Sequence, residues 1–344
     1  MSIRLSSFNE VLLKQFVLRE ESMKVPLDIL VNLHIENPFL KPISLALADY
    51  PDLFWHSTMV ATGDNNLLQK LSGGKILNGH SSELNQRAPG AFLHDIGKLG
   101  IVSGSIESSL KIMDWVPYQL DKSAPREPQT DNRFPEIRAI QHLHPLVGYE
   151  MIIQLIENGL IPRERGIKIA EQILNHHKTD GVFKTSYPGD KLVLDGRDRV
   201  QVAGEFLTQI VDVSVSMLSD RPYRKRLSLE IIKTKLAKYF SNKKLLSFIL
   251  PVFEISSVNL LKDGIFRQTL ATLEQLEPFI NTQPSKESLV ALISNCQPTI
   301  SNERVDLQAL INQVWKIKHL EFAEEYSRGL SSEYFHDGRE TSLS

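Results

Sequence analysis

Residues 91–98 read Ala-Phe-Leu-His-Asp-Ile-Gly-Lys, and they carry most of what the sequence predicts. An imidazole and a carboxylate stand side by side, and adjacent residues of a helix diverge by about 100°. Their apolar neighbours predict that His94 and Asp95 are buried. A buried His-Asp pair without partners is costly, so burial calls for a metal ion or a hydrogen-bond network. The dipeptide alone fits an ordinary core or surface pair better than a metal site, so its weight depends on partners elsewhere.

Candidate partners lie on both sides of this stretch. Asp52 and His56 are four residues apart, which places them on one face if the segment is helical. Such a pair is more often a surface interaction. Further along, His144 opens the run His-Pro-Leu-Val-Gly, with His142 as a second candidate two residues earlier. Imidazole nitrogen and carboxylate oxygen suit divalent transition metals such as iron, manganese and zinc.

Two later segments add candidate ligands. His176 and His177 end an apolar run over 167–174 that is typical of a buried helix. They could reach two metals of one cluster, or equally offset the dipole at a helix C-terminus. Asp212 lies in the apolar stretch 210–216, where an unpaired carboxylate is expensive. That stretch alternates and is rich in β-branched residues, a pattern that by itself favours a strand.

Helical periodicity is clearest in the later part of the chain. Apolar residues recur there at the spacing that puts them on one helix face. The sets are Leu229, Ile232, Leu236 and Tyr239; Leu260, Leu261, Ile265, Leu270 and Leu273; and Leu307, Leu310, Ile311 and Val314. Between 103 and 135 four prolines predict a long loop, with one short helix near 106–115.

The bulk composition is that of an ordinary globular protein. The 344 residues are 42% hydrophobic and carry a formal net charge of -2, which gives no reason to expect binding to a nucleic-acid duplex. Cys296 is the single cysteine, so no internal disulfide can form, as fits a reducing compartment. No apolar run reaches the ~18 residues that suggest a membrane span. We expect a cytoplasmic protein.

The motifs gain meaning from their order. Along the chain they read His, His-Asp-x-Gly-Lys, His-Pro-x-x-Gly, His-His, Asp and Arg-Pro-Tyr-Arg. This order resembles the HD-GYP family of HD-domain metal-dependent phosphohydrolases, from about Asp52 to about Phe240. The resemblance implies an all-α fold, an HD-domain helical bundle with additional N- and C-terminal helical segments. It also implies two or three divalent metal ions, most often iron or manganese, and hydrolysis of cyclic di-GMP to the linear dinucleotide or GMP in bacterial signalling.

The resemblance also assigns roles to individual residues. Asp95 matches the bridging carboxylate, and Lys98 matches the lysine that contacts the scissile phosphate; these are the expected catalytic residues. Arg221, Arg224 and Tyr187 are expected to bind the substrate with Lys98, since a guanidinium fork suits phosphate. The segment around Asp212 is expected to be helical, against its alternating pattern. The full expected ligand set is Asp52, His56, His94, Asp95, His144, His176, His177 and Asp212.

The chain departs from the family pattern after His177. The family usually writes His-His-Glu-x-x-Asp-Gly-x-Gly-Tyr-Pro, whereas Lys178 and Ser186 stand here in place of the Glu and the second Gly, and the spacings differ. The metal ligands are therefore expected to be intact while the substrate stays open. One alternative is an HD phosphohydrolase of another nucleotide. Another is a module that keeps its metals but serves signalling or dinucleotide binding without catalysis.

The sequence divides into four zones. Residues 1–45 form an unassigned N-terminal segment, and residues 46–250 are expected to form the phosphohydrolase domain. Residues 251–335 are expected to be a C-terminal helical region, which could contact a signalling partner or a second copy of the chain. Residues 336–344 are a polar, frayed tail.

Overall fold

The described part of the protein is all-α, as the sequence predicted. The computed structural model describes residues 24–73, 86–102, 143–177, 194–220, 225–240, 242–253, 255–282, 284–296 and 304–331, and within these ranges it contains helices, turns and no strand. The short helix expected near 106–115 lies outside these residues. In chain order the elements are α2 (Lys24–Glu36), α3 (Leu40–Leu47), α4 (Pro51–Gly73), α6 (Ala88–Leu93), α7 (Gly97–Val102), α11 (His144–Glu157), α12 (Arg163–Asn175), α13 (Arg199–Leu218), α14 (Leu229–Tyr239), α15 (Lys243–Ile249), η5 (Leu250–Val252), α16 (Val258–Ile280), α17 (Lys286–Ser294) and α18 (Leu307–Ser331).

The helix predictions from apolar periodicity are confirmed. The sets starting at Leu229, Leu260 and Leu307 lie within α14, α16 and α18, respectively. The alternating stretch 210–216 lies inside α13, so the helix implied by the family resemblance is confirmed and the strand pattern is wrong. Along this stretch α13 is buried on almost every side, so burial gives no helical period there.

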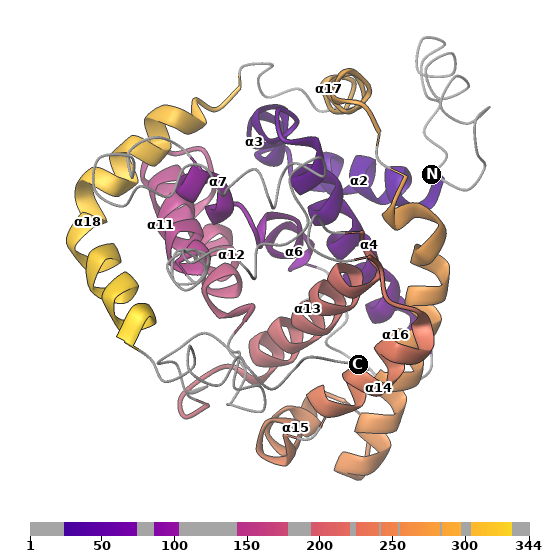
Figure 1. Ribbon diagram of the computed structural model, residues 1–344. Helices are drawn as coiled ribbons and strands as arrows, with labels where there is room; N and C mark the ends of the chain where they lie inside the picture. Colours follow the sequence, from indigo (N-terminus) through magenta and orange to yellow (C-terminus); the bar gives the residue numbers. More distant parts are fainter. Residues whose placement is uncertain are drawn as a thin grey trace.

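Two hydrophobic clusters form the core. The first gathers apolar side chains of α3, α6, α11, α12 and α18, and the second those of α13, α14, α15 and α16. Helix α4 belongs to both, because Phe54 faces the first cluster while Met59 faces the second. Figure 1 shows the short α6 near the middle of the molecule, with α18 and α16 at opposite outer sides.

Close backbone contact fixes α7 against α11. A Cβ on Gly97 would lie 1.9 Å from the carbonyl oxygen of His144 and 2.5 Å from the amide nitrogen of Gly148. Those neighbours are backbone atoms that cannot move aside, so only glycine allows this approach. The glycine after His94-Asp95 and the glycine of the His-Pro-x-x-Gly run therefore bring two candidate ligand segments together.

None of the described helices is both long enough and apolar enough to cross a membrane.

Candidate metal centre

Five helical segments meet at one buried point and each brings a candidate ligand. His56 comes from α4, and His144 is the first residue of α11. His94 and His176 are the C-terminal caps of α6 and α12, so each stands where its helix ends toward the centre. Asp212 comes from the interior of α13. Helices from distant parts of the chain thus converge on the His94-Asp95 pair.

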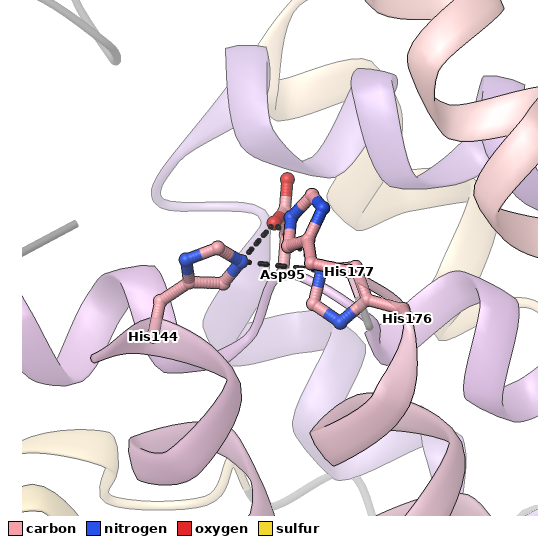
Figure 2. A group of neighbouring side chains, drawn as sticks. All are labelled: Asp95, His144, His176 and His177. Carbon is pink, nitrogen blue, oxygen red and sulfur yellow. Dashed lines mark hydrogen bonds and ion pairs between the residues drawn. The ribbon is translucent and has the colours of Figure 1, made fainter. Parts of the chain in front are cut away.

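The Asp95 carboxylate is the hub of this centre. Its Oδ2 lies 3.2 Å from Nε2 of His94 and 3.4 Å from Nε2 of His56, while its Oδ1 lies 3.2 Å from Nε2 of His144 and 3.9 Å from Nε2 of His176. Figure 2 shows Asp95 with His144, His176 and His177 gathered around it. Each carboxylate oxygen faces its own set of imidazoles, which is the arrangement a bridging ligand needs.

A second carboxylate closes the other side of the centre. Oδ1 of Asp212 lies 3.0 Å from Nε2 of His56 and 3.5 Å from Nε2 of His94. Three overlapping groups of side chains could each hold an ion, with ligand atoms within 4.8 Å of one another. They are Asp95, His144, His176 and His177; His56, His94 and Asp95; and His94, His176 and Asp212.

The hydrogen bonds of the histidines fit a metal site. Nδ1 of His94 lies 2.8 Å from the carbonyl oxygen of Ala91, and Nδ1 of His176 lies 2.5 Å from that of Ile173. A carbonyl can only accept, so each Nδ1 must carry a proton, and the Nε2 of each ring is left to face the centre. Second partners of this kind typically orient metal-binding histidines.

Some ring nitrogens of the centre face one another at short range. Nε2 of His144 and Nε2 of His176 are only 3.2 Å apart, and the buried Nε2 of His94 makes no hydrogen bond of acceptable geometry. Facing lone pairs repel each other unless a proton or a metal ion lies between them. The residues present therefore fit one or more divalent ions bound by nitrogen and oxygen.

Burial and neighbouring charges shift the pKa values of His176, His94 and Asp95 in the ion-free centre. Burial, together with the neighbouring His144 and His94, lowers the pKa of His176 to about 3. Burial also acts to lower the pKa of His94, but the carboxylates of Asp95 and Asp212 outweigh it and raise that pKa to about 10. Burial raises the pKa of Asp95, yet His94 and Lys98 hold it well below its usual range. Both carboxylates are thus ionised, as metal ligands must be.

Lys98 stands at the edge of the centre. Its Nζ lies 2.5 Å from Oδ2 of Asp95, and its side chain keeps 21% of its surface exposed while Asp95 keeps 1%. The Lys98 ammonium group thus lies between the buried Asp95 carboxylate and solvent. That position would let Lys98 meet a negatively charged group arriving at the centre.

Most of the ligands expected from the sequence are brought together. The three groups contain His56, His94, Asp95, His144, His176, His177 and Asp212. Asp52 does lie one turn before His56 on α4, but it is partly buried and belongs to none of these groups. Tyr187, Arg221 and Arg224 lie outside the described residues, as does His142.

Sequence reasoning missed a buried polar set behind the centre. It comprises Asp64, Arg87, Gln172, Glu205 and Thr208, which come from α4, the start of α6, α12 and α13. A signal existed, because Gln172 precedes His176 by four residues and Thr208 precedes Asp212 by four. Side chains at this spacing share a helix face, so polar residues one turn before two ligands continue the polar face away from the centre.

Comparisons with protein-family models, with curated proteins and with solved structures found no match for this chain.

Proposed function

We propose that this protein is a metal-dependent phosphohydrolase that hydrolyses a cyclic dinucleotide, with cyclic di-GMP as the first candidate. The observation that supports the proposal is the convergence of seven His and Asp side chains, far apart in sequence, on one buried point. The order of the sequence motifs, which resembles that of the HD-GYP family, supports a cyclic dinucleotide as the substrate. The metals expected for such a nitrogen and oxygen site are iron or manganese, two or three per chain.

The residues of the chain would divide the work. The histidines and both aspartates would hold the ions, and Asp95 would bridge two of them. A bound divalent ion supplies Lewis acidity and lowers the pKa of water toward neutrality. Lys98 would hold a non-bridging phosphate oxygen from the partly exposed edge of the centre, and its charge would offset the charge that develops there. No protein nucleophile is required, and the buried Cys296 has its pKa raised to about 11 by burial, so it is a thiol at neutral pH.

The test combines metal analysis with a substrate panel. Protein purified without oxygen is analysed for bound metal and then incubated with cyclic dinucleotides, guanosine tetraphosphate and simple nucleotides. The expected result is at least two ions per chain and a linear dinucleotide or GMP from cyclic di-GMP. His34→Asn is a matched control, because His34 is a buried histidine outside the centre.

Three other outcomes would decide against parts of the proposal. Turnover of a different nucleotide would keep the phosphohydrolase and replace its substrate. Tight binding of cyclic di-GMP with metal bound and no product would indicate a signalling module. Wild-type protein that takes up no more metal than a variant lacking Asp95 would remove the metal centre itself.

A further inference from the structure

A buried chain of polar side chains links α4, α13 and α12 to the first turn of α6. Oδ1 of Asp64 lies 3.2 Å from Oγ1 of Thr208, and that hydroxyl lies 3.0 Å from the side-chain amide of Gln172. The other end of the amide reaches the carbonyl oxygen of Arg87, where α6 begins. Asp64, Thr208 and Gln172 are each at most 3% exposed, so water cannot supply missing hydrogen bonds.

The neighbours of the Gln172 amide decide which way it points. With its nitrogen toward Thr208, its oxygen faces the Arg87 carbonyl oxygen and its nitrogen faces the Ala91 N–H, so two contacts are repulsive. With its oxygen toward Thr208, the amide nitrogen donates to the Arg87 carbonyl at 3.2 Å and the oxygen accepts from the Ala91 N–H at 3.2 Å and from the Thr208 hydroxyl at 3.0 Å. The second orientation replaces both repulsive contacts by hydrogen bonds and is the one that holds.

The Thr208 hydroxyl has only one proton, and this orientation uses it. The proton points to Gln172, so the 3.2 Å contact between Thr208 and Asp64 must be bridged by a proton from Asp64. An ionised Asp64 would instead take the Thr208 proton and leave the oxygens of Thr208 and Gln172 facing each other at 3.0 Å. We infer that Asp64 is protonated in the folded protein and donates into a one-way chain, Asp64 to Thr208 to Gln172 to the Arg87 carbonyl, that positions α6.

The charges around Asp64 are consistent with a bound proton. Burial raises the pKa of Asp64 to about 6, against the opposing charge of Arg87 and the hydrogen bond to Thr208. If the Thr208 proton points to Gln172, that opposing hydrogen bond is lost, which further favours the protonated carboxyl. On the α13 side the charged groups that act on Arg87 are Glu205, Arg197 and Asp198, and Glu205 pairs with Arg197 at 2.6 Å. From α16 the same part of α4 meets the apolar Leu276.

The chain ends at the first turn of α6, the short helix that leads to His94. A Cβ on Gly90 would lie 2.1 Å from the Gln172 amide, so the amide is seated directly against the α6 backbone. Helix α6 is six residues long and His94 is its C-terminal cap, so less than two helical turns separate its first turn from His94 and Asp95. Asp64 is therefore a positioning residue. The protonation of Asp64 does not depend on the proposed function. The effect of Asp64 on metal binding does depend on the proposed function.

The first test uses metal-free protein and compares wild type with Asp64→Asn, whose amide donates to Thr208 as a protonated carboxyl does. Urea unfolding is measured from pH 4 to 8. In the wild type the folded state holds a proton that the unfolded chain releases near its ordinary pKa of 3.8. The unfolding free energy of wild type should therefore fall relative to that of Asp64→Asn as the pH rises from about 4 to about 6, and then level off. Its slope against pH should correspond to about one proton released on unfolding. A zero slope, or a slope of opposite sign as expected for Asp64 ionised beside Arg87, overturns the inference.

A second measurement does not require the variant to be stable. The infrared spectrum of metal-free wild type near pH 5 should contain a carboxylic acid carbonyl band that Thr208→Val shifts and Thr208→Ser retains. Absence of any protonated buried carboxyl overturns the inference.

The positioning role is then read from manganese affinity. We expect Thr208→Val and Asp64→Ala to weaken it by roughly tenfold or more, and Asp64→Asn to restore it. Equal losses in Asp64→Asn and Asp64→Ala would overturn the positioning role. If wild type binds no manganese, the proposed function fails while the pH comparison still decides the protonation of Asp64.

Discussion

At the scale of single residues, the centre combines two carboxylates with several imidazoles. Asp95 and Asp212 supply negative charge, and the Nδ1–H groups of His94 and His176 are fixed by backbone carbonyls. Nitrogen and oxygen ligands of this kind could hold a divalent ion. If they do, metal content is the property that these residues control most directly.

Asp95→Asn keeps the shape of the hub and removes its charge. We expect affinity for divalent ions to fall by about 100-fold or more, with loss of at least one ion per chain, because both carboxylate oxygens face ligand imidazoles. Metal content by mass spectrometry and manganese titration would measure this. Asp49→Asn is the matched control, since Asp49 pairs with Lys286 and Arg304 at the surface and should leave metal content unchanged.

His34 predicts a separate pH dependence. Its Nδ1 lies 2.7 Å from the Leu30 carbonyl and its Nε2 lies 2.7 Å from the Ser44 hydroxyl, and burial lowers its pKa to about 4. The unfolded chain binds the proton near 6.5, so stability from this residue is complete above pH 6.5 and is lost as the pH falls toward 4. The loss amounts to roughly 3 kcal/mol. Urea unfolding should show a flatter pH profile in this range for His34→Asn than for wild type, and equal profiles would contradict the assignment.

The candidate ligands could be predicted because each lies in a short local pattern. His94 and Asp95 are adjacent, and His144 is marked by the proline and glycine that follow it. The chain behind the centre could not be predicted in the same way, because Gln172 and Thr208 meet only when α12 packs on α13. Contacts between helices depend on crossing geometry, which no local spacing encodes.

At the scale of elements, burial explains where sequence patterns succeed and fail. In α14, α16 and α18 one face is exposed, so apolar residues recur with the helical period. In α13 nearly all positions of 210–216 are buried, and the choice of Val and Ile reflects packing rather than a strand. A helix inside the core has no polar face, so its sequence lacks the helical period of apolar residues.

The contact between α7 and α11 gives a prediction for Gly97. Gly97→Ala forces a Cβ against backbone atoms of α11, and we expect a loss of about 3 kcal/mol in unfolding free energy together with weaker metal binding. Urea unfolding and manganese titration would measure both. Gly100→Ala is the graded control, because its Cβ would meet a side-chain methyl group of Val147 2.4 Å away rather than backbone atoms, and should cost less. Equal costs would show that the backbone contact is not decisive.

At the scale of the whole molecule, the two core clusters join parts of the chain that the sequence separates. The first contains residues of α2 and α3 together with Phe322 of α18, and the second contains Leu27 of α2 with much of α16. Trp315 of α18 donates its indole N–H to the carbonyl oxygen of Gly100 on α7, at 2.8 Å. The first and last described helices thus support the segment that carries Asp95 and Lys98. The domain boundaries proposed from sequence stay predictions.

Phe322 tests this integration. It is fully buried in the first cluster, so Phe322→Ala should lower the unfolding free energy by about 3–5 kcal/mol. Leu320→Ala on the same helix is the control, because Leu320 is 69% exposed and should change stability by less than about 0.5 kcal/mol. Thermal unfolding should shift as a single transition in the first variant. Separate melting of α18, with the rest unchanged, would contradict the shared core.

The contact between His56 and Asp212 joins residues 156 positions apart, and it closes the metal centre. During synthesis, α4, α6, α11 and α12 leave the ribosome first and bring most of the imidazoles. The last carboxylate, Asp212 on α13, follows them. Contacts of such long range form late, after the entropy of closing the chain has been overcome. If the centre holds an ion, its uptake would report that synthesis and collapse have reached α13. In a refolding experiment, metal binding should lag behind helix formation, and that lag would time the last long-range step.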